Sequence, residues 1–394
     1  MSSRTTPTSD QRGGEAPGHP PDGSSSRPSK NNRQARSEPP EPVGPRDLPD
    51  GTGLRPLSVE PGRRLRDEAV LEVSDGPQAR PWYSVVESWR DWYADYLGSH
   101  IEFENSEGET ARTELENSYM PKYGKRYYAK LKDFERGVQR EFDGMTTVML
   151  TFTASHRNAE GGWRCPADHM RDIMEGYDAA RKQLHQVLSG ANWEYARVWE
   201  PHADGYGHLH MAVFVEDSDS ADLRAEQFEP VMRSHVENCG PAGSEAHAVE
   251  GDDAAVSVND DVENLGSYVS EYIGIFGDET LNRPMAEQMF YAVTWATNTR
   301  RVDFSNGAQE MMNREQVRRE FRRDTDGLEP EDCPEEFEDW QDEEDEDGPV
   351  SEWVAESICT VSNRSPDYVD PTSGGVETTA IEGRSGVDPP PSIR

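Results

Sequence analysis

The sequence from residue 146 to about 310 predicts an α+β or α/β fold around one sheet. Short apolar runs rich in β-branched residues alternate there with longer segments whose apolar residues recur at helical spacing. Alternation of strand and helix patterns is typical of helices layered on a sheet. The flanking segments are dominated by polar residues, Pro and Gly, so this central part is expected to hold the core.

Each element is predicted from its own pattern. Val148-Met-Leu-Thr-Phe-Thr153 is apolar and β-branched, as a buried strand requires. Apolar residues from Met170 to Val187 follow helical spacing, and Gly190 provides a stop. Strands are expected at 148–153, 194–199, 207–215 and 255–258, and helices at 167–189, 221–237, 262–276 and 284–296.

The flanks divide into three further segments. Residues 1–80 contain too few apolar side chains to order themselves and are expected to be disordered. Residues 81–145 read as a helical, partly basic extension that begins with an aromatic helix and includes a Glu-rich loop to about residue 115. Residues 311–394 read as a basic helix followed by a disordered acidic tail, because 324–347 carry fifteen acids and no base.

Composition indicates the environment of the protein. The net charge is −37, and only six of the 40 basic residues are lysines. An acidic, lysine-poor protein suits a salt-filled cytoplasm, where repulsion is screened, so a halophilic archaeal source is indicated. The four cysteines show no metal-binding or disulfide spacing. No apolar run is long enough for a membrane span, so a cytoplasmic protein without a membrane partner is expected.

The segment from Glu200 to Val215 contains the strongest metal-binding pattern. Side chains two apart on a strand point the same way, so His208 and His210 should project together. The Pro/Asp/Gly loop before them can fold Glu200 back beside the pair if the two strands form a hairpin. Two nitrogens and a hard oxygen suit Mg²⁺ or Mn²⁺; Zn²⁺ is possible but lacks a supporting motif. The alternative is a His pair that binds nothing.

Residues 121–140 reverse the acidic trend. They contain four of the six lysines, and tyrosines are interleaved with the cations. Cations for phosphates and rings for bases make this helix a candidate nucleic-acid surface, although a solvated amphipathic helix would look similar. The candidate DNA-binding residues here are Lys122, Lys125, Arg126 and Lys130.

Two tyrosines supply a candidate nucleophile. Tyr268 and Tyr272 share one face of the helix expected at 262–276. A phenolate can attack a phosphodiester and remain attached to the DNA, which conserves the bond energy for rejoining. The alternative is an ordinary apolar helix face that also includes Leu265 and Val269.

The order of these elements resembles the rolling-circle replication initiators of the HUH endonuclease superfamily. Thr151-Phe-Thr153 comes first, then Gly207-His-Leu-His210, then the tyrosine pair spaced as in the two-tyrosine initiators of small haloarchaeal plasmids. The resemblance covers residues 146–305. It implies an α+β domain at about 146–310 with a central antiparallel sheet flanked by helices. It also implies single-stranded origin DNA as substrate and a host helicase and polymerase as partners.

The resemblance assigns roles by position. His208 and His210 match the motif that binds the cation, and Glu200 matches a third, acidic ligand. Tyr268 matches the nicking tyrosine, which forms a 5′-phosphotyrosine link, and Tyr272 matches the tyrosine that alternates with it.

One position departs from the family pattern. One-tyrosine relatives carry a lysine three residues after the nucleophile, where this chain has Glu271. Either Arg300 or Arg301 compensates by contacting the DNA, or the role of that lysine is dispensable here; a further alternative places Glu271 itself close to the metal. Two other interpretations stay open: a transposase of the same superfamily, and a non-catalytic DNA-binding regulatory protein in which these residues only pack.

Overall fold

The computed structural model describes residues 41–106, 108–216, 223–251, 254–259, 280–325, 327–331, 333–338 and 355–361 of the 394-residue chain. The segment expected to carry Tyr268 and Tyr272 lies outside these residues. So do residues 1–40 and the part of the acidic tail at 339–354.

The central sheet confirms the predicted α+β class. Its strand order is β8-β5-β7-β6-β9, and every neighbouring pair is antiparallel. The strands are β5 (Met145–Phe152), β6 (Trp193–Pro201), β7 (Gly207–Glu216), β8 (Val256–Asn259) and β9 (Val302–Phe304). The helices are α1 (Trp82–Tyr96), α2 (Pro121–Glu141), α3 (Pro166–Val187), α4 (Glu229–Asn238), α6 (Met285–Ala296) and α7 (Asn306–Asp324).

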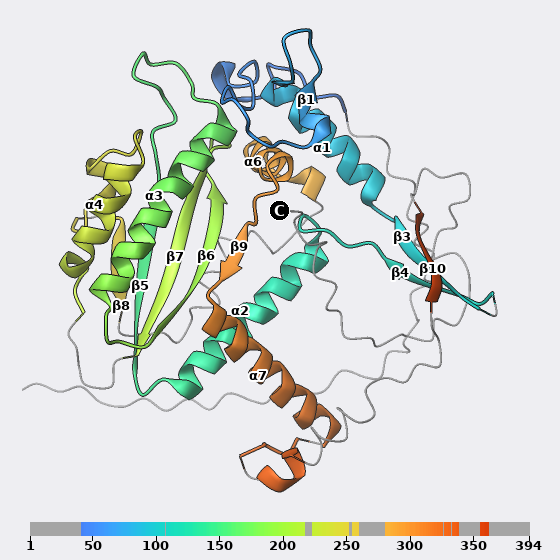
Figure 1. Ribbon diagram of the computed structural model, residues 1–394, viewed down its shortest axis with the longest axis vertical. Coiled ribbons are helices and arrows are strands. Elements are labelled where there is room, and N and C mark those ends of the chain that lie inside the picture. The colour runs from blue at the N-terminus through green and yellow to red at the C-terminus, as the bar shows by residue number, and fades with distance from the viewer. Residues whose placement is uncertain are drawn as a thin grey trace, which may run out of the picture. The chain divides into compact units, whose positions relative to one another are not determined.

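Helices cover both faces of this sheet (Figure 1). Alternate residues of a strand point to opposite faces, and β7 shows this directly. Leu209, Met211 and Val213 belong to the core shared with α1, α3, α4 and α6. Ala212 and Phe214 belong to a second core shared with α2 and α7. Buried apolar surface on both faces is what keeps the strand register from slipping.

The segment before α1 is ordered from residue 41, so the boundary expected at residue 80 was wrong. Val43, Leu48, Leu57 and Ala69 are buried in the first core. The segment includes short 3₁₀ turns (Pro49–Gly51 and Asp67–Ala69) and the strand pair β1 (Val70–Leu71) and β2 (Gln78–Ala79). Its few apolar side chains do not form a core of their own. They dock on a core supplied by α1 and α6, which local composition does not reveal.

The Glu-rich segment expected as a loop is a hairpin. Strand β3 (His100–Asn105) pairs with β4 (Thr110–Glu114), and β10 (Ala355–Val361) pairs with the other edge of β3. The prediction of an unstructured last segment was therefore wrong at 355–361. In β3, Ile101 and Phe103 alternate with Glu102 and Glu104, which is the strand period. The high Glu content concealed that alternation.

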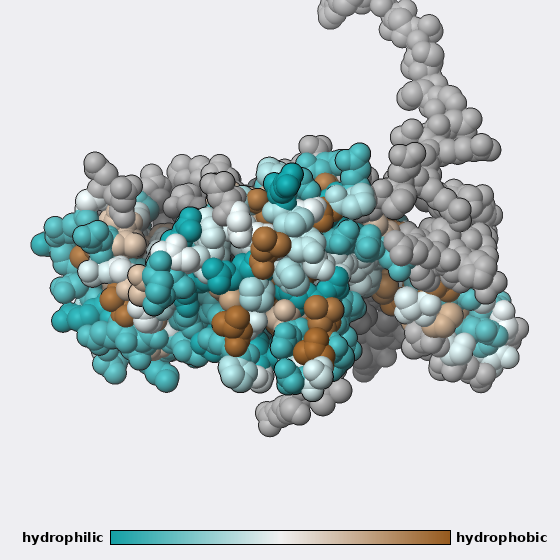
Figure 2. All heavy atoms as spheres, turned by 90° about the horizontal axis from the view of Figure 1, so that it is seen from above, coloured by the Kyte–Doolittle hydropathy of each residue, from teal (hydrophilic) through white to brown (hydrophobic). Residues whose placement is uncertain are grey.

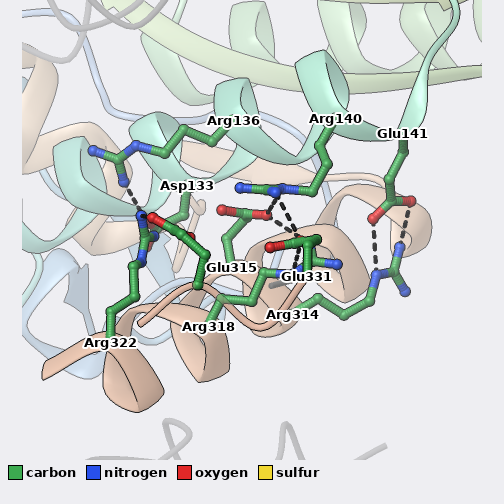
Figure 3. Close-up of polar contacts among 10 residues, drawn as sticks. Asp133, Arg136, Arg140, Glu141, Arg314, Glu315, Arg318, Arg322 and Glu331 are labelled. Atoms are coloured by element: carbon green, nitrogen blue, oxygen red, sulfur yellow. Dashed lines mark hydrogen bonds and ion pairs between the residues drawn. The ribbon is translucent and has the colours of Figure 1, made fainter. Parts of the chain in front are cut away.

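An ion-pair network joins α2 to α7 (Figure 3). Glu315, only 1% exposed, accepts hydrogen bonds from Arg140 Nε at 3.0 Å and Arg318 Nη1 at 2.8 Å. At the end of α2, Arg314 binds Glu141 through two contacts of 2.8 and 2.6 Å. A carboxylate this deeply buried is stable only while its cationic partners remain in place.

Two buried histidines hold the end of β5. His235 Nε2 donates to the Thr153 carbonyl at 3.1 Å, and the Thr153 N–H donates to His247 Nε2 at 3.2 Å. His247 Nδ1 donates to the Gly243 carbonyl at 2.7 Å. Burial lowers the pKa of His235 to about 4. The hydrogen bonds to the Thr153 backbone are therefore made by neutral imidazoles.

The described surface is mainly hydrophilic. On the face shown in Figure 2, apolar side chains gather only in small separate groups. Among the described residues, no helix combines the length and apolar character that a membrane crossing needs. Within the described ranges, the large exposed apolar side chains are Leu54, Val59, Leu71, Val73 and Leu328.

The network at Glu315 should contribute strongly to stability. We expect Glu315→Ala to lower the free energy of unfolding by about 3 kcal/mol, because Arg140 and Arg318 would lose a buried partner. Arg323→Ala, which removes an exposed pair with Asp324, should cost less than about 0.5 kcal/mol. Urea unfolding at constant KCl would measure both; equal effects would contradict the importance of the network.

Stability should fall on acidification. His235 has an ordinary pKa of 6.5 when unfolded and about 4 when folded, so between these values the unfolded chain binds more protons. Stability is then lost as the pH falls through this window, by up to about 3 kcal/mol. We expect the free energy of unfolding, measured with denaturant, to be lower at about pH 4.5 than at neutral pH. In His235→Phe this part of the pH dependence should vanish, and an unchanged dependence would refute the assignment.

Candidate metal centre

The three predicted ligands come together through strand pairing. In the register of β6 with β7, Glu200 lies directly opposite His208 and Val198 opposite His210. In the register of β5 with β7, Thr151 lies opposite His210. By strand alternation, all four polar side chains share the sheet face that α2 and α7 cover further along.

The geometry of the cluster is compact. Glu200 Oε2 lies 3.1 Å from His208 Nε2 and 2.9 Å from His210 Nε2. One ligand atom from each residue falls within 4.8 Å of the others. Burial opposes ionisation of Glu200, but the hydrogen bonds with the two histidines outweigh it and lower its pKa to about 2. The carboxylate is thus charged and aimed at both imidazoles.

The second ring nitrogen of each imidazole, Nδ1, also has a hydrogen-bonding partner. His208 Nδ1 lies 2.8 Å from His202 Nε2, and His210 Nδ1 lies 3.0 Å from the Thr151 hydroxyl. Both Nε2 atoms therefore face Glu200. Sequence reasoning missed the role of His202. Its position after Glu200-Pro201, in a tight turn leading back to His208, was the available signal.

The turn between β6 and β7 is shaped by glycine. The His202 N–H donates to the Tyr206 carbonyl at 2.7 Å, and the Gly205 N–H donates to the His202 carbonyl at 2.9 Å. Gly205 has a φ of +85°, and a Cβ there would lie 2.8 Å from Met289 Cβ on α6. At Gly207 a Cβ would lie 2.8 Å from the Phe290 ring. Close packing of α6 on this turn keeps Glu200 and His208 facing each other.

A further pair of polar side chains extends the cluster. His156 Nδ1 lies 2.6 Å from Asp204 Oδ2, and the His156 and His202 rings are 4.8 Å apart. Burial lowers the pKa of His202 to about 4. Asp204 also has a lowered pKa, since its bond with His156 outweighs burial. His202 is therefore a neutral imidazole between the two groups.

The predicted cations of α2 lie near acidic and aromatic partners. Lys122 Nζ is 2.5 Å from Glu116 Oε1, and Arg126 also pairs with Glu116. Lys130 lies over the Tyr127 ring, 5.5 Å from its centroid. Lys125 is exposed and has no acidic partner among the described residues. Their DNA-binding role remains a prediction.

The two arginines after α6 differ. The Trp199 N–H donates to the Arg301 carbonyl at 2.8 Å, which places Arg300 and Arg301 beside the Glu200 end of β6. The Arg301 guanidinium lies 4.8 Å from the Tyr291 ring centroid and bonds a backbone carbonyl, so it supports the fold. Arg300 is exposed. Tyr268, Tyr272 and Glu271 lie outside the described residues, so the structure does not relate them to the cluster.

Comparison with known proteins places the chain in a family. Residues 57–357 match the family described as "Putative rep protein (DUF1424)". The match begins within the ordered segment before α1 and spans the whole sheet. The chain belongs to this family, which is named for replication proteins.

Two relatives come from haloarchaea, as the composition indicated. An "Uncharacterized 36 kDa protein" of Halobacterium salinarum is 38% identical over 273 residues, covering 66% of this chain and 85% of the relative. A protein with the same description from Halobacterium sp. (strain GN101) is 36% identical over 275 residues, covering 64% and 83%. No solved structure matches the chain.

Proposed function

We propose that the protein is a rolling-circle replication initiator that nicks one DNA strand at an origin and later rejoins the ends. The observation that carries this proposal is the cluster of two imidazoles and one carboxylate on paired strands, in a chain of the Rep family. Family membership favours replication over the related transposase activity. Unwinding and synthesis would fall to a host helicase and polymerase.

The donor set fits Mg²⁺ or Mn²⁺. Glu200 offers a charged, hard oxygen, and His208 and His210 each offer Nε2 on the same side. These three residues would hold the ion. A bound divalent cation would polarise the scissile phosphate and stabilise negative charge in the transition state.

His202 and Thr151 are proposed to prepare the two ligands. A neutral imidazole that binds a cation through Nε2 carries its proton on Nδ1. His202 Nε2 is placed to accept that proton from His208, and the Thr151 hydroxyl oxygen is placed to accept it from His210. Such partners would fix the ring orientation of each ligand, and would hold its proton on Nδ1 once an ion replaces the hydrogen bonds between Nε2 and Glu200.

The proposed reaction is a transesterification by tyrosine. The Tyr268 oxygen would attack the phosphorus, forming a 5′-phosphotyrosine bond while the bond to the 3′-oxygen breaks and that oxygen leaves as a hydroxyl. In the reverse step a 3′-hydroxyl attacks the phosphotyrosine and releases Tyr268. Tyr272 would serve as the second nucleophile, alternating with Tyr268 at initiation and termination.

Removing the first nucleophile should stop the first nick. We expect Tyr268→Phe to abolish the covalent adduct on a single-stranded origin oligonucleotide in Mn²⁺, because phenylalanine has no attacking oxygen. Mass spectrometry of the protein would detect the nucleotide adduct. His208→Ala with His210→Ala should also abolish it while leaving the unfolding transition in place.

Two results would count against this scheme. If Tyr268→Phe still formed as much adduct as the wild type, the first nick would have to be assigned to Tyr272. Full adduct formation by the wild-type protein in a chelating buffer would exclude the metal role of the cluster.

The support from His202 should appear in metal binding itself. We expect His202→Ala to weaken Mn²⁺ binding by about 10–100-fold, since His208 would lose the partner of Nδ1. His202→Gln, whose amide oxygen can accept the same proton, should recover part of the affinity. Isothermal titration calorimetry measures this without catalysis. Exposed His185→Ala is the matched control, and equal affinities in all four proteins would remove the positioning role.

A further inference from the structure

A short hairpin between β5 and α3, residues 155–164, projects an arginine and a tryptophan beside the metal centre. Arg157 and Trp163 pair as an isolated antiparallel bridge. The turn closes through Asn158, whose side-chain oxygen accepts the Gly162 N–H at 2.7 Å. Gly161 has a φ of +79°, a conformation that favours glycine. The hairpin is thus a built element with a defined shape.

Arg157 is fixed in place without an acidic partner. Its guanidinium carbon lies 3.4 Å from the Trp163 ring centroid, and Nη1 donates to the Gly161 carbonyl at 3.3 Å. The residue is exposed, and it makes no salt bridge with any described residue. Glu160, in the same turn, is exposed and does not pair with it. By contrast, the arginines of α7 are paired with acids: Arg314, Arg318, Arg319, Arg322 and Arg323.

A stack of rings connects Arg157 to the metal centre. The Trp163 and Tyr206 rings lie 5.9 Å apart at an interplanar angle of 13°. The Tyr206 and His156 rings lie 4.6 Å apart at 10°. His156 in turn contacts His202, the residue behind His208. A group bound at Arg157 therefore lies at the outer end of a series of ring contacts, two stacked and one edge-on, that leads toward the candidate ligands.

A second arginine reaches the same turn from a distant part of the chain. A Cβ built on Gly162 would lie 3.4 Å from Arg55 Nη2, an ordinary contact distance, so the Arg55 guanidinium lies beside the hairpin turn. Arg55 is partly buried and has no salt bridge with a described residue. Two arginines that form no salt bridge with a described residue thus lie at one turn of a protein whose net charge is −37.

We propose that this hairpin binds single-stranded DNA next to the metal centre, with Arg157 as the principal contact and Arg55 as a second cation. The inference rests on the proposed nicking function and adds the surface that guides the strand toward the cluster.

The chemistry of the site favours a single strand. A planar guanidinium can stack on a base with its outer face while its N–H groups bind phosphate oxygens. Trp163 keeps that plane fixed, so little side-chain freedom is lost on binding. Unstacked bases, which only a single strand offers freely, are what such a plane recognises.

Binding in the absence of metal tests the proposal separately from cleavage. Fluorescence anisotropy would follow a labelled single strand of mixed sequence in EDTA, with full-length protein, at several KCl concentrations. We expect Arg157→Ala to weaken binding by about tenfold and to lower the salt slope by about 0.7, the value for one phosphate contact on a single strand. Arg157→Lys should restore the slope but not the full affinity, because lysine cannot stack as a plane.

Matched variants separate the possible outcomes. Arg233→Ala removes an exposed arginine of α4, paired with Glu229, and should bind as the wild type does. If Arg157→Ala binds like the Arg233→Ala control, the inference is overturned, whether or not the wild type nicks DNA. If binding is lost as expected but the wild type forms no adduct with Mn²⁺, the proposed nicking fails and the DNA-binding surface stands.

Discussion

The hydrogen-bonded register of β5, β7 and β6 is the constraint on which the candidate site depends. It sets Glu200 opposite His208 and Thr151 opposite His210, all on one face of the sheet. A slip of one residue would turn these side chains to the other face and carry apolar residues out of both cores. The apolar residues between the polar positions therefore do more than stabilise the domain. By making any other register unfavourable, they hold a charged carboxylate and two imidazoles together.

Packing outside the sheet completes the arrangement. Met289 and Phe290 of α6 pack against the turn between β6 and β7 so closely that a Cβ at Gly205 or Gly207 would collide with them. His202 and Thr151 occupy the rear nitrogens of the imidazoles. The hydrogen bonds of His235 and His247 to the Thr153 backbone connect the end of β5 to α4 and to the segment that contains His247. Each support comes from a different element, so the cluster depends on the tertiary fold as well as on the hairpin that carries it.

The sequence allowed the local parts of this structure to be predicted. The period-2 pattern around His208 and the turn residues before it were sufficient for the strand pair and for the meeting of Glu200 with both histidines. Features that depend on distant partners were missed. Leu57 is buried by helices far along the chain, and β10 pairs with β3 across most of the sequence. The spacing of apolar residues within one segment gives no information about such contacts.

The pairing of arginines with acids along α2 and α7 bears on how such a protein can meet a polyanion. At about 1 M salt the screening length is only about 3 Å, so neither the overall negative charge nor a distant cation is felt by an approaching strand. Capture cannot then rely on long-range attraction. It must depend on short-range contacts, such as stacking on a flat side chain, which weaken less with ionic strength than long-range attraction does. At high salt, an arginine that already stacks on a tryptophan ring is better suited to binding the strand than a flexible cation extended into solvent.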